Sequence, residues 1–131
     1  LEGYVSLVPA LSEPHYVLAD LHLALGDLSR AKNEAALGHA NYKGGLTTAR
    51  RAALFYERTQ DWEHSVFYLQ SIVDQDEDDI IFYYDLAKVH YMLGDYTSAL
   101  QIVNDLRARN PEILPTDANF MAAITEYEKS L

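Results

Sequence analysis

The sequence of 131 residues has no cysteine and little positive charge, with ten Lys and Arg against twenty Asp and Glu. Without cysteine it offers no disulfide framework, no thiolate metal site and no thiol nucleophile. Its formal net charge of −10 argues against a nucleic-acid surface, because phosphate binding needs clustered Lys and Arg. No apolar run approaches the roughly 20 residues of a membrane span, and no basic and then apolar leader opens the chain. We therefore expect a soluble protein, periplasmic or cytoplasmic, that neither binds nucleic acid nor inserts into a membrane.

Recognisable catalytic patterns are also missing from the sequence. Its Ser, His and acidic residues form no nucleophile motif, and it has no Gly-rich phosphate loop. His15 and His22 are separated by two helical turns, about 10 Å, which is too far to share one zinc ion. The acidic run at 74–85 mimics a calcium loop, but it lacks the glycine of the sixth position and ends in Asp85 rather than Glu. We expect no enzyme activity, no metal site and no cofactor, and core packing for both histidines.

What the sequence does contain is a period of 34 residues. Leu-Gly-Asp at 25–27 returns at 93–95, and Thr-Gln-Asp occupies the midpoint at 59–61. Small residues recur in the same register, at Ala31, Ser65 and Ala99. A repeat of this length is one supersecondary unit that buries its apolar face by stacking on its neighbours. The chain is therefore expected to be a short array of such units.

Each period reads as two helices joined by a tight turn. In the third period, residues 79–93 are apolar at helical spacing, and Gly94 supplies the left-handed backbone that ends a helix. Asp95 then caps a second helix, which stops before Pro111. In the second period Gln60 takes the place of the glycine. A left-handed Gln60 would cost about 1 kcal/mol relative to glycine.

This pattern resembles the tetratricopeptide repeat, a family with a 34-residue signature that places Leu-Ala early in the first helix, Gly-Asp in the turn and Pro near the end. The third period fits most closely, through Tyr83, Leu86, Ala87, His90, Gly94, Asp95, Tyr96, Ala99 and Pro111. In the first period Glu34 and Gly38 depart from the signature, and we expect them to weaken its second helix.

The resemblance implies an all-α fold, a right-handed α-solenoid of about three helical hairpins plus a C-terminal helix, with about seven helices in all. We expect one domain over residues 1–131, divided according to the period. Residues 1–11 would be the tail of a preceding repeat or a leader, 12–45, 46–79 and 80–113 the three repeats, and 114–131 a helix that caps the exposed end.

In this family a partner generally binds in a concave groove lined by the first helix of each repeat. The resemblance assigns to that groove Tyr16, Asp20, Leu23, Arg50, Leu54, Arg58, Ile81, Tyr84, Lys88, Tyr91 and Met92. Helix 79–93 is apolar nearly all round, which is typical of a helix buried on two sides or of one that presents a face to a ligand. Either a partner or a neighbouring helix, the last helix included, is expected to cover that face.

One function of the family is excluded by the residues at its key positions. Members that grip the acidic C-termini of heat-shock chaperones use a set of Lys, Arg and Asn residues. The corresponding residues in this sequence are Tyr16, Asp20, Arg51, Ile81 and Asp85. The clamp is therefore absent, and the remaining expectation is binding of an amphipathic or extended protein segment.

Protein binding is thus the function that the sequence predicts. The expected apolar anchors are Tyr84, Tyr91 and Met92, while Arg50 or Lys88 would meet acidic groups. The chain begins at Leu1 rather than Met, which favours a fragment of a longer scaffold, such as the repeat arrays of bacterial envelope, secretion and exopolysaccharide-export assemblies. The alternatives are a small acidic chaperone like those of type III secretion, a regulatory domain attached to an enzyme, and self-association in which one copy's groove takes another copy's end.

Overall fold

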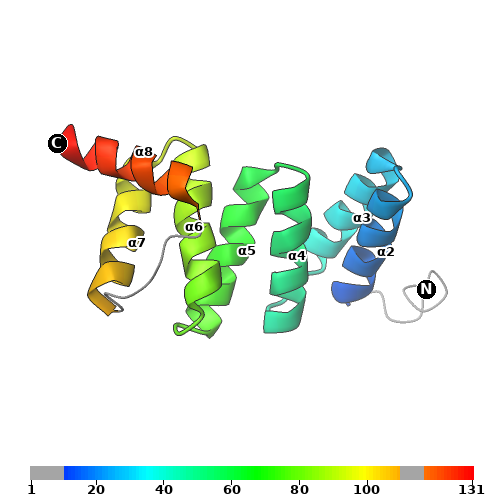
Figure 1. The fold of residues 1–131 in the computed structure, drawn as a ribbon. Helices are drawn as coiled ribbons and strands as arrows, with labels where there is room; N and C mark the ends of the chain where they lie inside the picture. The colour runs from blue at the N-terminus through cyan, green and yellow to red at the C-terminus, as the bar shows by residue number, and fades with distance from the viewer. Residues whose placement is uncertain (1–10, 110–116) are drawn as a thin grey trace. The chain divides into compact units, whose positions relative to one another are not determined.

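The computed structural model describes residues 11–109 and 117–131, and within those ranges the chain forms seven helices and no strand (Figure 1). The helices are α2 (Glu13–Ala24), α3 (Leu28–Ala40), α4 (Leu46–Arg58), α5 (Trp62–Gln75), α6 (Ile80–Met92), α7 (Tyr96–Arg109) and α8 (Ala118–Lys129). The all-α class predicted from the repeat is confirmed. Across the described helices, none has both the length and the apolar character needed to span a bilayer. The predicted leader or preceding repeat at 1–11 falls almost entirely outside the described residues.

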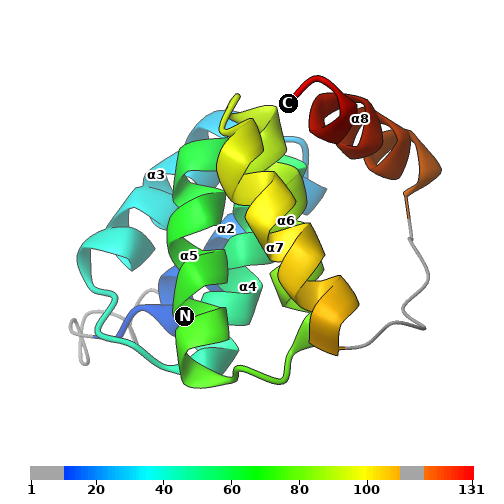
Figure 2. The same ribbon diagram turned by 90° about the vertical axis from the view of Figure 1, so that its left-hand side faces the viewer.

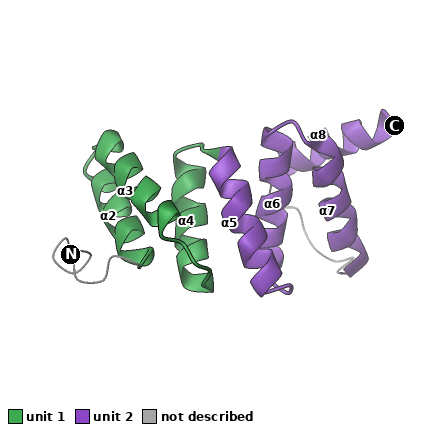
Figure 3. Ribbon diagram, turned by 180° about the vertical axis from the view of Figure 1, so that it is seen from behind, with its two compact units in different colours: residues 1–61 green, residues 62–131 purple. Residues whose placement is uncertain are grey.

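The helices form two compact units, of which the first ends at Asp61 and the second begins at Trp62 (Figure 3). Unit 1 contains α2, α3 and α4, and unit 2 contains α5, α6, α7 and α8. The boundary between the units lies between the two helices of the predicted second repeat, 46–79. Each unit is described separately below.

The three turns that the period aligns share one hydrogen-bonding geometry. In each turn the backbone N–H of an aspartate donates to the carbonyl oxygen of the residue five positions earlier. The three bonds, all of 2.9 Å, run from Asp27 to His22, from Asp61 to Tyr56 and from Asp95 to His90. The residues before these aspartates have positive φ, with 80° at Gly26, 58° at Gln60 and 83° at Gly94. This arrangement ends a helix in left-handed backbone, and the conformation predicted for Gln60 is confirmed.

Unit 1 is organised around the ring of Tyr16 on α2, which has no solvent exposure. The Tyr16 hydroxyl lies 3.1 Å from the hydroxyl of Tyr56 on α4. Burial raises the pKa of Tyr56, so this hydroxyl stays protonated and donates to the carbonyl oxygen of Ala35 on α3, at 3.1 Å. A Cβ atom on Gly38 of α3 would lie 2.7 Å from Cε2 of Tyr16, so the glycine leaves the space that the ring occupies.

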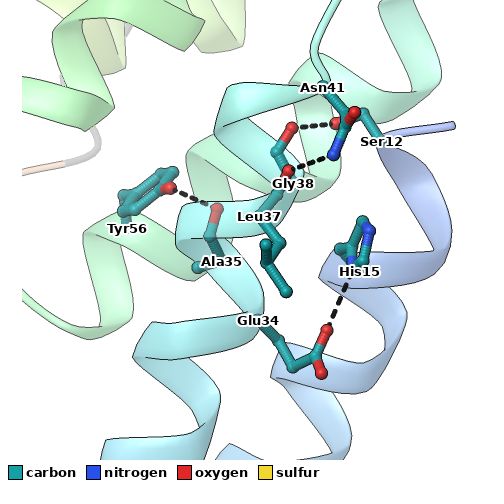
Figure 4. Close-up of polar contacts among 8 residues, drawn as sticks. All are labelled: Ser12, His15, Glu34, Ala35, Leu37, Gly38, Asn41 and Tyr56. Atoms are coloured by element: carbon teal, nitrogen blue, oxygen red, sulfur yellow. Dashed lines mark hydrogen bonds and ion pairs between the residues drawn. The ribbon is translucent and has the colours of Figure 1, made fainter. Parts of the chain in front are cut away.

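Polar contacts also join α2 to α3 (Figure 4). Nδ1 of His15 lies 2.9 Å from Oε2 of Glu34, and the Ser12 hydroxyl donates to the carbonyl oxygen of Gly38 at 2.6 Å. His15 is only 6% exposed, which confirms its predicted packing in the core. Glu34 and Gly38, which were expected to weaken α3, lie at its contacts with α2: Glu34 through its carboxylate, and Gly38 through its carbonyl oxygen and the space that it leaves for Tyr16. Their departure from the repeat signature is explained by these contacts.

In unit 2, α5, α6 and α7 pack through apolar side chains, and α8 runs across α6 and α7 at one edge of the unit (Figures 1 and 2). The carboxylate of Asp117 caps α8, because it accepts a hydrogen bond from the N–H of Phe120 at 3.0 Å. The buried side chains of α8 are Phe120 and Ile124. The helix is therefore attached to unit 2 through one face.

Candidate functional site

Three arginines of α4 gather around a hollow that α2 and α4 form in unit 1. Arg50, Leu54 and Arg58 follow one another at intervals of four residues, so they make one stripe along the helix. The hollow has a volume of about 290 Å³ and is lined by Asp20, Thr47, Arg50, Arg51, Leu54 and Arg58. We call these six residues the arginine face.

The Asp20 carboxylate pairs with two of the three guanidinium groups of the arginine face. Oδ2 of Asp20 lies 3.2 Å from Nη1 of Arg51, and Oδ1 of Asp20 lies 3.8 Å from Nη1 of Arg58. Oδ1 of Asp20 and Nε of Arg51 are buried without a hydrogen-bond partner among the described residues. Buried polar atoms normally have a hydrogen-bond partner. Oδ1 of Asp20 can therefore accept a hydrogen bond from a bound group, and Nε of Arg51 can donate one. The six residues of the face comprise three bases and one acid, and positive charge attracts acidic groups.

Apolar surface accompanies the charges on this side of unit 1. Leu54, in the middle of the stripe, is 42% exposed. A second hollow, of about 380 Å³, shares Arg58 with the first and is lined by Leu23, Gly26, Leu28, Arg58, Thr59 and Gln60. A protein segment that crosses both hollows would thus meet guanidinium groups and leucine side chains in turn.

The corresponding face of α6 in unit 2 is covered rather than open. The ring of Phe120 on α8 lies 5.7 Å from the ring of Tyr84 and 5.7 Å from the ring of Tyr91, in edge-to-face geometry with both. Nζ of Lys88 lies 3.5 Å from Oδ2 of Asp117. Tyr84 and Tyr91 therefore do lie on one stripe of α6, and the last helix of the chain covers that stripe.

The structure separates the predicted groove residues into groups with different environments. Five of them line the two hollows of unit 1: Asp20, Leu23, Arg50, Leu54 and Arg58. Three contact α8: Tyr84, Lys88 and Tyr91. Two are exposed on α6: Ile81 at 73% and Met92 at 56%. Tyr16 belongs to the core of unit 1 instead of the groove, because its ring fills the space beside Gly38.

Arg51 is the charged residue of the arginine face that was not among the predicted groove residues. It follows Arg50 directly in the sequence. Asp20 draws its side chain to the hollow through the 3.2 Å ion pair. The sequence signal for this contact was an acid, Asp20, in the first helix of one repeat and a base, Arg51, at a nearby position in the first helix of the next repeat.

In the two ranges 11–109 and 117–131, no group of three or more His, Cys, Asp or Glu side chains is placed to bind a metal ion. At the start of α6 the Asp79 carboxylate caps the helix, because it accepts a hydrogen bond from the N–H of Phe82 at 3.3 Å. Burial raises the pKa of Asp85 on the same helix, an effect that the nearby charge of Lys88 opposes.

Helix pairs that repeat with one turn geometry define a helical-hairpin repeat protein. A family model described as tetratricopeptide repeat matches residues 60–123, which contain α5, α6 and α7. This stretch therefore contains tetratricopeptide repeats, as the sequence pattern predicted. No curated protein matches the sequence. Proteins of this family generally mediate protein–protein interactions, and they are typically scaffolds without enzyme activity.

Proposed function

We propose that this chain is a protein-binding module whose arginine face takes a segment of a partner protein, one with acidic side chains next to an apolar side chain. The observation that carries the proposal is the stripe of α4, in which an exposed Leu54 lies between Arg50 and Arg58 over a hollow. Arginine forms bidentate hydrogen bonds with carboxylates, and it is enriched among the residues that dominate interface energies.

The spacing of the two arginines in the stripe predicts the spacing of the acidic side chains in the partner. Arg50 and Arg58 are eight residues apart, which is about 12 Å along a helix axis. Two carboxylates at that separation are about four residues apart in an extended segment and about eight residues apart in a helix. The apolar side chain that contacts Leu54 lies between them in either case.

The setting that we propose for this binding is a longer repeat scaffold in a bacterial envelope, secretion or exopolysaccharide-export assembly. Its support is the resemblance of the repeat pattern. A secretion chaperone or a domain that regulates an attached enzyme would use the same kind of surface. The reading frame that surrounds these residues distinguishes the three, through flanking repeats, a signal peptide or a catalytic domain.

Selection from a random library of peptides about 16 residues long, on the full chain, tests the proposal. We expect the enriched peptides to share acidic residues at the spacings above. Their dissociation constants should rise at least about tenfold for the variant Arg50→Glu, Arg58→Glu, because interface anchors contribute about 2 kcal/mol or more and about 1.4 kcal/mol corresponds to tenfold. Higher salt should weaken the same peptides.

A matched control reverses two charges elsewhere in unit 1. Arg30→Glu, Lys32→Glu changes the net charge equally on α3, where Arg30 is 73% exposed and Lys32 is also exposed. This control should bind the selected peptides as tightly as the parent, and circular dichroism should show the same helicity for all three chains. Selected peptides that lack acids, or that bind the arginine-face variant as tightly as the parent, would contradict the proposal.

A further inference from the structure

The face of α6 and α7 that α8 covers is a second surface, separate from the arginine face. It consists of Tyr84, Lys88 and Tyr91 on α6 and of Tyr96, Thr97 and Arg107 on α7, and we call these six residues the α8 seat. The ring of Tyr96 lies 5.5 Å from the ring of Tyr127, and Oγ1 of Thr97 lies 3.0 Å from the Tyr127 hydroxyl. The seat thus combines aromatic rings with polar groups.

The residues of α8 that meet the seat follow a helical pattern. Phe120, Ile124 and Tyr127 occupy positions i, i+4 and i+7, which is the spacing of the anchors that an amphipathic helix places in a groove. Acidic groups lie at both ends of this pattern. Asp117 pairs with Lys88 at 3.5 Å, and Glu128 lies 3.9 Å from Arg107. α8 therefore shows which helix chemistry the seat accepts.

The attachment of α8 to the seat is limited. Among its described side chains only Phe120 and Ile124 are buried. The side chains of Arg107 and Glu128 are 41% and 45% exposed, and ion pairs at that exposure contribute little to stability. The Tyr84 hydroxyl is buried without a hydrogen-bond partner among the described residues, so the contact leaves one polar group unsatisfied.

α8 also leaves apolar side chains of α6 uncovered. Ile81 near the start of α6 and Met92 at its end are 73% and 56% exposed, while Tyr84 and Tyr91 between them lie under Phe120. Because α8 crosses α6 instead of following it (Figure 1), it does not reach both ends. A helix that ran along α6 would cover these side chains. It would also have to contact the two tyrosine rings, which Phe120 covers.

We infer that α8 is an internal occupant of a helix-binding face, and that an amphipathic helix of a partner protein displaces it from the α8 seat. The partner helix carries an acidic N-cap, an aromatic residue three positions later, an aliphatic residue four positions after that and a tyrosine three further on. A tethered helix competes at an effective concentration on the order of millimolar. Binding at the seat is therefore conditional on release of α8, whereas the arginine face is open.

The test uses a fluorescent peptide with the sequence of residues 116–131 and the full chain in two forms. The parent chain should bind the peptide weakly, because its own α8 fills the seat. The variant Phe120→Ala loses the aromatic anchor of its own helix, so we expect it to bind the peptide at least about tenfold more tightly. Adding Tyr91→Ala to that variant should remove the gain, since this ring contacts the phenylalanine.

Three controls establish whether the peptide binds at the seat. Asn119→Ala changes an exposed position of α8 and should leave peptide binding as weak as in the parent. A peptide that carries alanine in place of its own phenylalanine should not bind the Phe120→Ala chain. The arginine-face variant Arg50→Glu, Arg58→Glu should leave binding of the 116–131 peptide unchanged, so a failure here is distinguishable from a failure of the proposed function.

Amide hydrogen exchange decides whether Phe120→Ala acts locally. We expect faster exchange in α8 and unchanged protection in α6 and α7. Loss of protection in α6 and α7 would overturn the inference, because α8 would then be part of the core. Equal affinity of the parent and of Phe120→Ala for the peptide would also overturn it. A dimer of the parent chain that the peptide dissociates would overturn it in favour of exchange of α8 between two copies.

Discussion

Tyr16 and Tyr84 lie 68 residues apart, at the same position of two repeats, yet different neighbours bury them. Tyr16 is enclosed by its own unit, with its ring against Gly38 and its hydroxyl 3.1 Å from that of Tyr56. Tyr84 is covered by Phe120 of α8, and its hydroxyl has no partner among the described residues. One repeat position therefore belongs to the core in unit 1 and to a covered surface in unit 2.

From the repeat register we infer that the difference between the two tyrosines comes from the second helix of each repeat. The position of Gly38 in α3 is taken in α7 by Leu106, which is 2% exposed. A buried leucine fills the space that the glycine leaves for an aromatic ring. Tyr84 accordingly makes its aromatic contact with α8 instead. A repeat position thus becomes core or surface according to the residue that faces it.

The same comparison holds for the two candidate surfaces. The α4 positions of Arg50, Leu54 and Arg58 correspond in α6 to Tyr84, Lys88 and Met92. The first set is open and charged, and α8 lies over part of the second. We propose that the first set binds acidic groups and that the second binds an amphipathic helix.

The largest effect on stability is expected from Gly38→Ala. The new Cβ atom would lie 2.7 Å from Cε2 of Tyr16, and overpacking of this kind costs about 1–3 kcal/mol. The higher helix propensity of alanine returns up to about 1 kcal/mol, so the free energy of unfolding in urea should fall. In a Tyr16→Ala background the clashing ring atoms are absent, and Gly38→Ala should then raise stability. A loss of the same size in both backgrounds would break the comparison between the two tyrosines.

An intermediate effect is expected at the turns. Gln60 has φ of 58°, where the other two aligned turns use glycine. Gln60→Gly should stabilise the chain by about 1 kcal/mol, because glycine adopts left-handed backbone without strain. Gly94→Gln is the converse variant and should lose about as much. A lower urea midpoint for Gln60→Gly would show that this side chain contributes more than its backbone strain costs.

The smallest effect is expected from the cap of α8. The N–H of Phe120 donates to Asp117 and, together with the charge of Lys88, holds the pKa of this carboxyl below its usual range. A lowered carboxyl pKa gives stabilisation that is complete above the unfolded pKa, about 3.9, and that is lost as the pH falls through the folded pKa. The pKa of Asp95 at the start of α7 is also lowered, first by its hydrogen bonds with Ser98.

We therefore expect the backbone amide signals of α8 to move away from helical shifts as the pH falls below about 4 in a nuclear magnetic resonance titration. Asp117→Asn keeps a capping side chain that does not titrate, so its α8 should respond less to acid. An identical acid response of α8 in the parent and in Asp117→Asn would remove the role assigned to this cap.

The sequence predicted those features that follow from the period. The turns at Gly26, Gln60 and Gly94 depend on spacing within a single turn, so a 34-residue register is enough to find them. The burial of Tyr16 could not be predicted, because it depends on the size of a residue on another helix. The repeat pattern also could not predict where α8 crosses α6, because α8 is not paired with a second helix in the described residues.

The central claim is that the arginine face binds a partner segment. The most direct test is a titration of a selected acidic peptide into the isotope-labelled full chain, in which the amide shifts of each residue are followed. The account predicts shifts concentrated in Leu46–Arg58 and around Asp20, with α6 and α8 unchanged, and a dissociation constant that rises with salt. Shifts confined to residues 62–131, or an affinity that is insensitive to salt, would contradict it.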